Sequence, residues 1–176
     1  YYGNKLTDNF NKLYHTDLNV KGLQINYKGN IALDELLLRD DYQDTIIYAK
    51  SLSTSLVNAF NTSGNDLHFS NTEFDQLKFK LKQYEDEKYD EFTKFLEKLN
   101  DTTASETSQA FLLKINRVIA FESEFTIINQ NISSEPTFSI QDLDFNISNF
   151  KIEGPDMNFN MRRMSGILKE GIIIDD

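Results

Sequence analysis

The chain has 176 residues, of which 39% are hydrophobic and 12% aromatic, with 7 Gly and 2 Pro. This composition supports one domain with a sizeable core and argues against extended disorder. The formal net charge of −10 excludes nucleic-acid binding through a basic surface and disfavours an anionic membrane surface as a partner. The absence of cysteine excludes disulfides, thiolate metal sites and cysteine nucleophiles.

The N-terminal segment carries apolar residues at helical spacing. Leu6, Phe10 and Leu13 fall on one face, which predicts an amphipathic helix over about residues 4–15, within an N-terminal unit of about residues 1–16. From Asp17 onward the apolar period changes to two, which is the spacing of half-buried strands. Six strand-like runs follow, over residues 18–27, 31–40, 45–57, 66–85, 111–128 and 137–154.

One helical segment interrupts these strand-like runs. Tyr89, Phe92, Leu96 and Leu99 recur at helical spacing, which predicts an inserted amphipathic helix at about residues 86–100. The Ser/Thr-rich segment that follows, at about residues 101–109, lacks apolar anchors and is predicted to be a mobile loop. The sequence therefore predicts a mainly β fold with an N-terminal helix and one inserted helix.

Several strand-like runs share one spacing: an apolar residue, two intervening residues, an apolar residue, and then alternation. The clearest copies begin at Val20, Leu33, Phe74 and Ile140, and degenerate copies begin at Ala49 and Ile115. Successive side chains of a strand point to opposite faces, so a gap of two residues breaks the phase. A bulge or bend at the gap restores the phase, and bends at the same place in successive strands would curl the sheet into a trough.

The apolar face of such a trough admits two interpretations. In the first, the two helices or a second sheet cover it and form a closed core. In the second, it stays open as a groove for an apolar ligand. The candidate groove-lining residues, each of which also fits ordinary core packing, are Leu23, Ile25, Tyr27, Leu36, Leu38, Leu77, Phe79, Leu81, Leu143, Phe145 and Ile147.

The sequence offers no constellation for covalent chemistry. His15 falls at the end of a predicted helix and His68 alternates with strand hydrophobics, and neither has a triad spaced around it. Residues 142–146, DLDFN, resemble the start of a calcium loop but lack its glycine and distal glutamate. The acidic residues within 40–44 fit turn capping better than a cation site. We therefore expect no catalytic residue, no metal ligand and no cofactor.

Two short motifs carry a family resemblance. DDYQDT at residues 40–45 and KQYE at residues 82–85 lie within a stretch, residues 9–83, that resembles the N-terminal periplasmic part of the TamB family of the Bacteroidota. These are translocation and assembly module proteins related to AsmA. The later SIQDLDFNISNFKIEGP, residues 139–155, is similar in style.

The resemblance implies a curved antiparallel β-sheet that forms a taco-like groove over residues 17–176, after a helix that follows a missing inner-membrane anchor. It implies a periplasmic location and passive conduction of phospholipid acyl chains between inner and outer membrane. Such conduction would support outer-membrane biogenesis and protein assembly or secretion. The implied partners are phospholipid, the inner membrane through the anchor, and an outer-membrane barrel protein of the TamA/BamA type through distal parts of the full-length chain.

A second hypothesis is a closed periplasmic or extracellular β-domain that binds a protein or a glycan. Aromatic residues on the polar face would favour it, because sugars stack on exposed rings. Tyr27, Phe79 and Phe145 instead fall on the apolar phase, which favours the groove. An enzyme ranks third, because no acid–base or nucleophile pair is in place.

Overall fold

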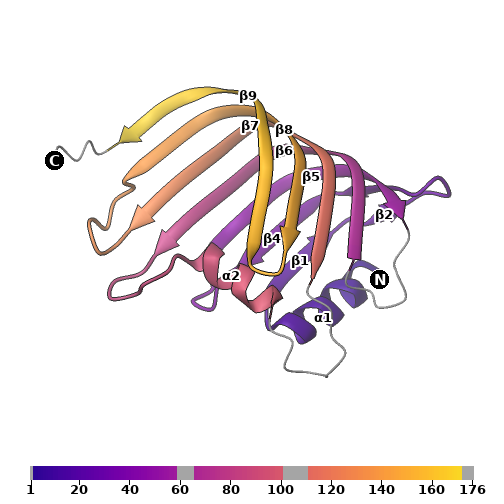
Figure 1. Ribbon diagram of the computed structural model, residues 1–176, viewed down its shortest axis with the longest axis horizontal. Helices are drawn as coiled ribbons and strands as arrows, with labels where there is room; N and C mark the ends of the chain where they lie inside the picture. Colours follow the sequence, from indigo (N-terminus) through magenta and orange to yellow (C-terminus); the bar gives the residue numbers. More distant parts are fainter. Residues whose placement is uncertain (1, 59–65, 101–110, 172–176) are drawn as a thin grey trace.

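The structure, a computed structural model, describes residues 2–58, 66–100 and 111–171. The elements in chain order are α1 (Tyr2–Tyr14), β1 (Asp17–Lys21), β2 (Gln24–Ile25), β3 (Asn30–Leu33), β4 (Glu35–Arg39), β5 (Thr45–Asn58), β6 (Asp66–Gln83), α2 (Glu91–Leu99), β7 (Leu112–Asn129), β8 (Phe138–Glu153) and β9 (Asp156–Gly171). The strands form a single sheet in the order β1-β4-β5-β6-β7-β8-β9, and β3 pairs with both β2 and β5. Figure 1 shows the strands arching over the two helices, which lie on the concave side.

The predicted curved, mainly β fold with an N-terminal and an inserted helix is confirmed. The sheet is mixed, whereas the resemblance implied antiparallel pairing throughout, because β6 and β7 run parallel. Parallel neighbours need a long crossover connection, and the segment that contains α2 provides it. Strand β9 has no counterpart among the predicted runs. The predicted mobile loop at 101–109 lies outside the described residues.

The bends predicted at the two-residue gaps are present. Gly22, Gln76 and Asp142 are the second gap residues of three repeat copies, and their φ angles are +63°, +51° and +50°. In the fourth copy the strand is interrupted at Asp34, which separates β3 from β4. Glu122, with φ of +47°, lies beside Gln76 on the neighbouring strand and accepts a hydrogen bond from its side chain at 3.3 Å. These residues form one bend line across the sheet.

A second bend line crosses the long strands nearer their other ends. The register between β5 and β6 shifts between Thr54 and Leu56. On β8, Asn149 has a φ of +55° and lies in a register shift with β9. At each bend one additional residue is inserted into the strand and shifts the alternation of side chains by one position. Apolar side chains on both sides of a bend line therefore point to the concave face.

Local sequence explains where the helices begin and end. Asp90 caps α2, since its side chain accepts hydrogen bonds from the backbone N–H groups of Phe92 and Thr93 at 3.0 Å each. This cap starts α2 at Glu91, later than predicted. α1 ends at Tyr14 and is followed by His15, whose φ is +52°. No helix among the described residues is long and apolar enough to cross a membrane.

The main core lies between the helices and the concave face. Phe92, Leu96 and Leu99 of α2 are buried there, as is Tyr14 of α1. They pack against strand residues from both ends of the arch, which include Leu38, Ile46, Phe79, Leu81, Leu113 and Ile152. The helices therefore span the mouth of the trough.

The bend lines give a stability prediction. Replacing Gln76 with Val should lower the free energy of unfolding by about 1–2 kcal/mol, because a β-branched residue fits a positive φ poorly. Gln76→Gly should cost nothing or stabilise, since glycine adopts this φ without strain. Urea denaturation measures both, with Lys78→Val on the same strand as the matched control. Equal losses for Gln76→Val and Lys78→Val would contradict a strained bend at Gln76.

Candidate functional site on the concave face

A row of side chains crosses the concave face between the two bend lines. Strand register sets its members side by side on neighbouring strands: Leu33, Leu52, Phe74, Ala120, Phe145 and Met164. We call this set the central row. Phe74 and Phe145 pack around the small buried cluster of Ile115, Val118 and Ile147. The central row runs perpendicular to the strands, along the axis of the trough.

Exposure varies along the central row and is highest at the β9 edge. Leu33 is 9% exposed and Ala120 is fully buried, whereas Met164 on β9 is 55% exposed. Phe145 is half-buried. No member of the row belongs to the core that the helices build. The central row is therefore most accessible at the β9 edge.

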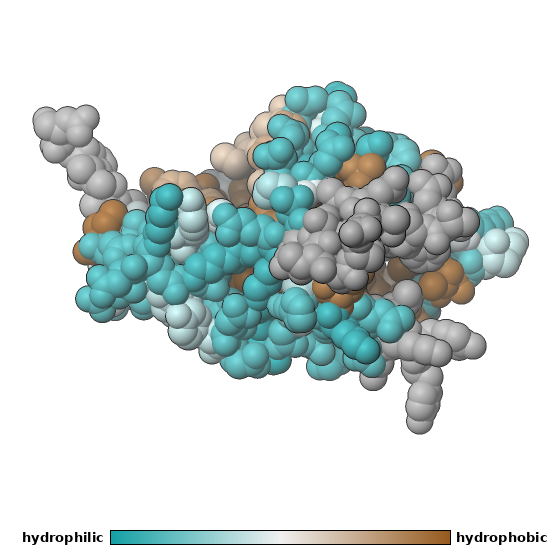
Figure 2. Space-filling model, turned by 60° about the horizontal axis from the view of Figure 1, so that its bottom comes forward, coloured by the Kyte–Doolittle hydropathy of each residue, from teal (hydrophilic) through white to brown (hydrophobic). Residues whose placement is uncertain are grey.

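The helices cover the apolar side chains on the concave face that lie beyond the bend line at Gln76, which we call the flanking rows. The ring of Phe79 contacts the ring of Phe92 in α2, with centroids 4.8 Å apart, and that of Phe125 at 5.6 Å. The interpretation of a closed core thus fits these rows, and the open groove is restricted to the central row and the β9 edge. Figure 2 turns the bottom of Figure 1 forward, and the surface that it shows is mostly hydrophilic with scattered hydrophobic patches.

The candidate lining residues fall into three groups. Leu38, Phe79 and Leu81 belong to or pack against the core beneath the helices. Those that are buried or half-buried outside this core are Leu23, Leu36, Leu77, Leu143, Phe145 and Ile147, of which Phe145 and Ile147 belong to or pack beside the central row. Ile25 and Tyr27 lie apart from them, at 59% and 93% exposure, because β2 is at the sheet edge and Tyr27 occupies the β2–β3 turn.

Of the central row, the candidate list contains Phe145 alone. The members that sequence reasoning missed are Leu33, Leu52, Phe74, Ala120 and Met164. Phe74 is the apolar residue before the gap in one repeat copy, and Leu52 is the apolar residue after the gap in a degenerate copy. The repeat therefore marked residues on both sides of the gap as candidates for the concave face. Met164 belongs to β9, which was not predicted. A continuous row across the sheet follows only from the strand register.

Polar side chains within the concave rows are already bonded. Thr54 and Thr72 are buried and hydrogen-bond each other at 2.8 Å. The hydroxyl of buried Ser123 donates to the carbonyl of Phe121 at 2.9 Å and accepts from the Leu77 N–H at 3.2 Å. These groups are satisfied internally, which keeps the face apolar toward a ligand.

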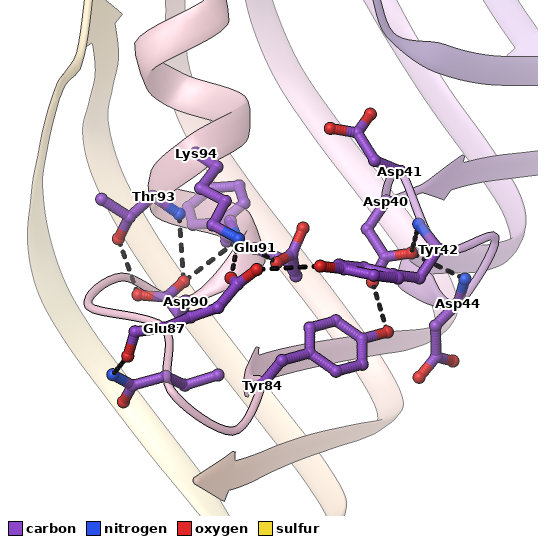
Figure 3. Close-up of polar contacts among 12 residues, drawn as sticks. Asp40, Asp41, Tyr42, Asp44, Tyr84, Glu87, Asp90, Glu91, Thr93 and Lys94 are labelled. Carbon is purple, nitrogen blue, oxygen red and sulfur yellow. Dashed lines mark hydrogen bonds and ion pairs between the residues drawn. The ribbon is translucent and has the colours of Figure 1, made fainter. Parts of the chain in front are cut away.

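The two family-like motifs meet in space at the mouth of the trough (Figure 3). The Tyr84 hydroxyl donates to Asp40 Oδ2 at 3.0 Å, and burial together with this bond raises the pKa of Tyr84. Lys80 and Lys82 bind Asp44 at 3.0 and 2.8 Å. Burial acts to raise the pKa of Asp44, but the bonds from Lys82 and Lys80 outweigh it and lower the pKa to about 2.

This cluster also binds the segment before α2 and the last turn of α2. Tyr42 donates from its hydroxyl to Glu87 at 2.9 Å, and Lys98 of α2 binds Asp41 at 2.5 Å. Glu91, the first residue of α2, is buried and pairs with Lys94 at 2.7 Å. Burial, with Asp40 and Asp41 nearby, raises the pKa of Glu91 to about 7. The motifs thus position a helix across the trough.

The two histidines and the carboxylates of the described residues form no arrangement suited to catalysis or metal binding. His68 hydrogen-bonds Asn116 at 2.9 Å, and His15 is exposed at the end of α1. Within the described ranges, no group of three or more His, Cys, Asp or Glu is placed to hold a metal ion. A cavity of about 530 Å³ lies at the β2–β3 hairpin, lined mainly by amide and hydroxyl side chains. It is separate from the central row.

Glu91 gives a pH prediction with a definite sign. Its folded pKa of about 7 exceeds the ordinary 4.5, so its ionisation costs stability as pH rises between these values. Glu91→Gln should therefore stabilise the fold by something of order 1 kcal/mol at pH 8 and leave it unchanged below pH of about 4.5. Urea unfolding across this pH range tests it, with exposed Glu97→Gln as control. A gain that is the same at every pH would refute the assignment.

No protein-family model, curated protein or solved structure matches this chain. The function is therefore inferred from the concave face, the bend lines and the two motifs that join α2 to the sheet.

Proposed function

We propose that the concave face binds the acyl chains of phospholipid and passes them along the axis of the trough. The observation that carries this proposal is the central row, which is apolar across six strands and most exposed at its β9 end. An acyl chain laid along the row contacts one strand after another, while its headgroup remains in water at the open edge.

The energetics suit conduction better than storage. Each buried CH₂ contributes about 0.8 kcal/mol, so an acyl chain gains from every strand that it covers. The bonded polar groups of the concave rows, such as Thr54 and Thr72, supply no strong clamp that would hold one lipid in place. Many similar weak contacts favour movement from one position to the next.

The wider setting follows from the family resemblance and belongs to the same proposal. The chain would act as the first groove section of a TamB-like protein in the periplasm, held at the inner membrane by an anchor. Distal parts of the full-length protein would reach an outer-membrane barrel partner of the TamA/BamA type. What supports this is the junction of DDYQDT with KQYE, since Asp40 bonds Tyr84 and Asp44 bonds Lys82. The role is transport and requires no covalent chemistry.

Photo-crosslinking tests the proposal. A p-benzoylphenylalanine at Phe145 should crosslink phospholipid from phosphatidylethanolamine vesicles, because this position faces the open part of the trough. The matched control is Asn146, the next residue on the same strand, which faces the opposite side. Mass spectrometry identifies the adduct, and circular dichroism verifies the fold. An intact fold with no lipid adduct at Phe145, or with equal adducts at both positions, would refute lipid binding by the central row.

A charge on the row gives a second test. Phe145→Asp should abolish lipid crosslinking from a probe at Phe74, since a carboxylate in the trough opposes an apolar ligand. Asn146→Asp should leave it unchanged. Phe79 is unsuited to this test, because its ring packs against Phe92 and a charge there should unfold the core. If crosslinking survives Phe145→Asp with an intact fold, the lipid path lies elsewhere.

A further inference from the structure

The cavity at the β2–β3 hairpin lies on the convex face of the sheet. Its volume is about 530 Å³. The central row points to the concave side, and successive residues of a strand point to opposite faces. Ala32, Ser53 and Glu73, which line the cavity, each adjoin a member of that row, and the register aligns them across β3, β5 and β6. The sheet itself therefore separates the cavity from the trough.

Small side chains form the floor of this cavity and longer ones form its walls. Ala32, Ser53 and Ser55 lie in the middle, on β3 and β5. Strand β6 contributes Asn71 and Glu73 on one side, and the β2–β3 hairpin contributes amide side chains on the other. The volume falls within the range of about 300–1,000 Å³ that is usual for small-molecule sites. The cavity thus has room for a small molecule that lies flat on the sheet.

Two amide groups of the hairpin are held with their NH₂ ends free. Asn26 Oδ1 accepts hydrogen bonds from the backbone N–H groups of Lys28 and Asn30, at 2.9 and 3.1 Å. Asn30 Oδ1 accepts from the Ser55 hydroxyl at 2.8 Å. Neither Nδ2 group bonds a described residue. The hairpin therefore presents two fixed donors at the cavity.

The opposite wall carries an unpaired acceptor. Glu73 has neither an ion pair nor a hydrogen bond with a described residue, whereas Asp75, its neighbour on the same strand and face, pairs with Lys50 at 3.6 Å. No lysine or arginine is among the described residues that line the cavity. A carboxylate without a cation disfavours phosphate and other anions, and the NH₂ groups of the hairpin offer nothing to a cation. The cavity therefore suits an uncharged ligand that both donates and accepts hydrogen bonds.

We propose that this cavity binds a neutral saccharide ring, either a free sugar or the headgroup of a glycolipid. Adjacent hydroxyls of the ring donate to Glu73 and accept from the NH₂ groups of Asn26 and Asn30. The C–H side of the ring lies on the small floor. Tyr27, in the same hairpin, is 93% exposed and is free to stack on the sugar. The proposal does not rest on lipid conduction, because the two sites lie on opposite faces of the sheet.

NMR titration of the whole chain tests the proposal. The probes are the methyl glycosides of glucose, galactose, mannose and N-acetylglucosamine at millimolar concentration. At least one should shift the side-chain NH₂ signals of Asn26 and Asn30 and the backbone amides of Ser53 and Glu73. The backbone amide of Phe145, on the opposite face, is the control. The phosphorylated form of the sugar that binds best should bind more weakly, since Glu73 repels phosphate.

Variants with matched controls locate the site. Glu73→Ala should weaken binding of the best methyl glycoside about 10-fold, because a hydrogen bond to a charged group is lost. Asp75→Ala, at the next position on the same face, should leave binding unchanged. Ser53→Phe should fill the floor and abolish the shifts, whereas Ser51→Phe, outside the cavity on the same face, should not. Signal dispersion in the same spectra verifies the fold of each variant.

The octyl glycoside of the same sugar separates the two sources. Tighter binding than the methyl glycoside, with shifts at the cavity, assigns a glycolipid headgroup, and equal binding assigns a free saccharide. The proposal fails if no methyl glycoside shifts the cavity signals, or if the shifts survive Ser53→Phe in a folded protein. It also fails if Glu73→Ala and Asp75→Ala have equal effects, or if the phosphorylated sugar binds as tightly. None of these results would alter lipid crosslinking at Phe145, so the two proposals can fail separately.

Discussion

The alternation of side chains along a strand is the constraint on which this structure depends. A flat strand can hold one apolar face only while the period of two is unbroken, and here it is broken at matching places in successive strands. Residues with positive φ, such as Gln76, Glu122 and Asp142, absorb the extra position. The apolar face therefore stays continuous while the sheet bends, and the bend makes a trough.

The position of α2 in the trough is set by the cluster of polar contacts around residues 40–44, at the mouth of the trough. Asp40 and Asp44 bind Tyr84, Lys80 and Lys82, and the same acidic turn binds Lys98 of α2. This cluster directs the apolar side of α2 onto the flanking rows and leaves the central row without a helix. Burial of Glu91 beside these acids raises its pKa, so the position of α2 carries an electrostatic cost that its apolar packing offsets.

Much of this architecture could be predicted from the sequence, because bends and helices are local. The gap before Leu77 predicts the bend at Gln76, and the spacing of Phe92 and Leu96 predicts α2. The parallel pairing of β6 with β7 and the capture of Phe79 by α2 depend on tertiary packing, which periodicity does not encode. Tyr27 continues the alternation of apolar residues from Leu23 and Ile25 but lies in a turn. Alternation alone does not show where a strand ends and a hairpin turn begins. β9 was missed although Met161 and Met164 flank a two-residue gap of the kind that marks the other bent strands.

The central claim is that the bend lines create an apolar trough that accepts acyl chains. The chain contains no cysteine, so a single introduced thiol reports on one position. We would measure labelling of Phe145→Cys and Asn146→Cys by a charged maleimide, with and without dihexanoylphosphatidylcholine below its micelle concentration. An acyl-binding trough predicts slower labelling at position 145 with lipid and no change at 146. Equal rates at 145 with and without lipid, in a folded protein, would contradict it.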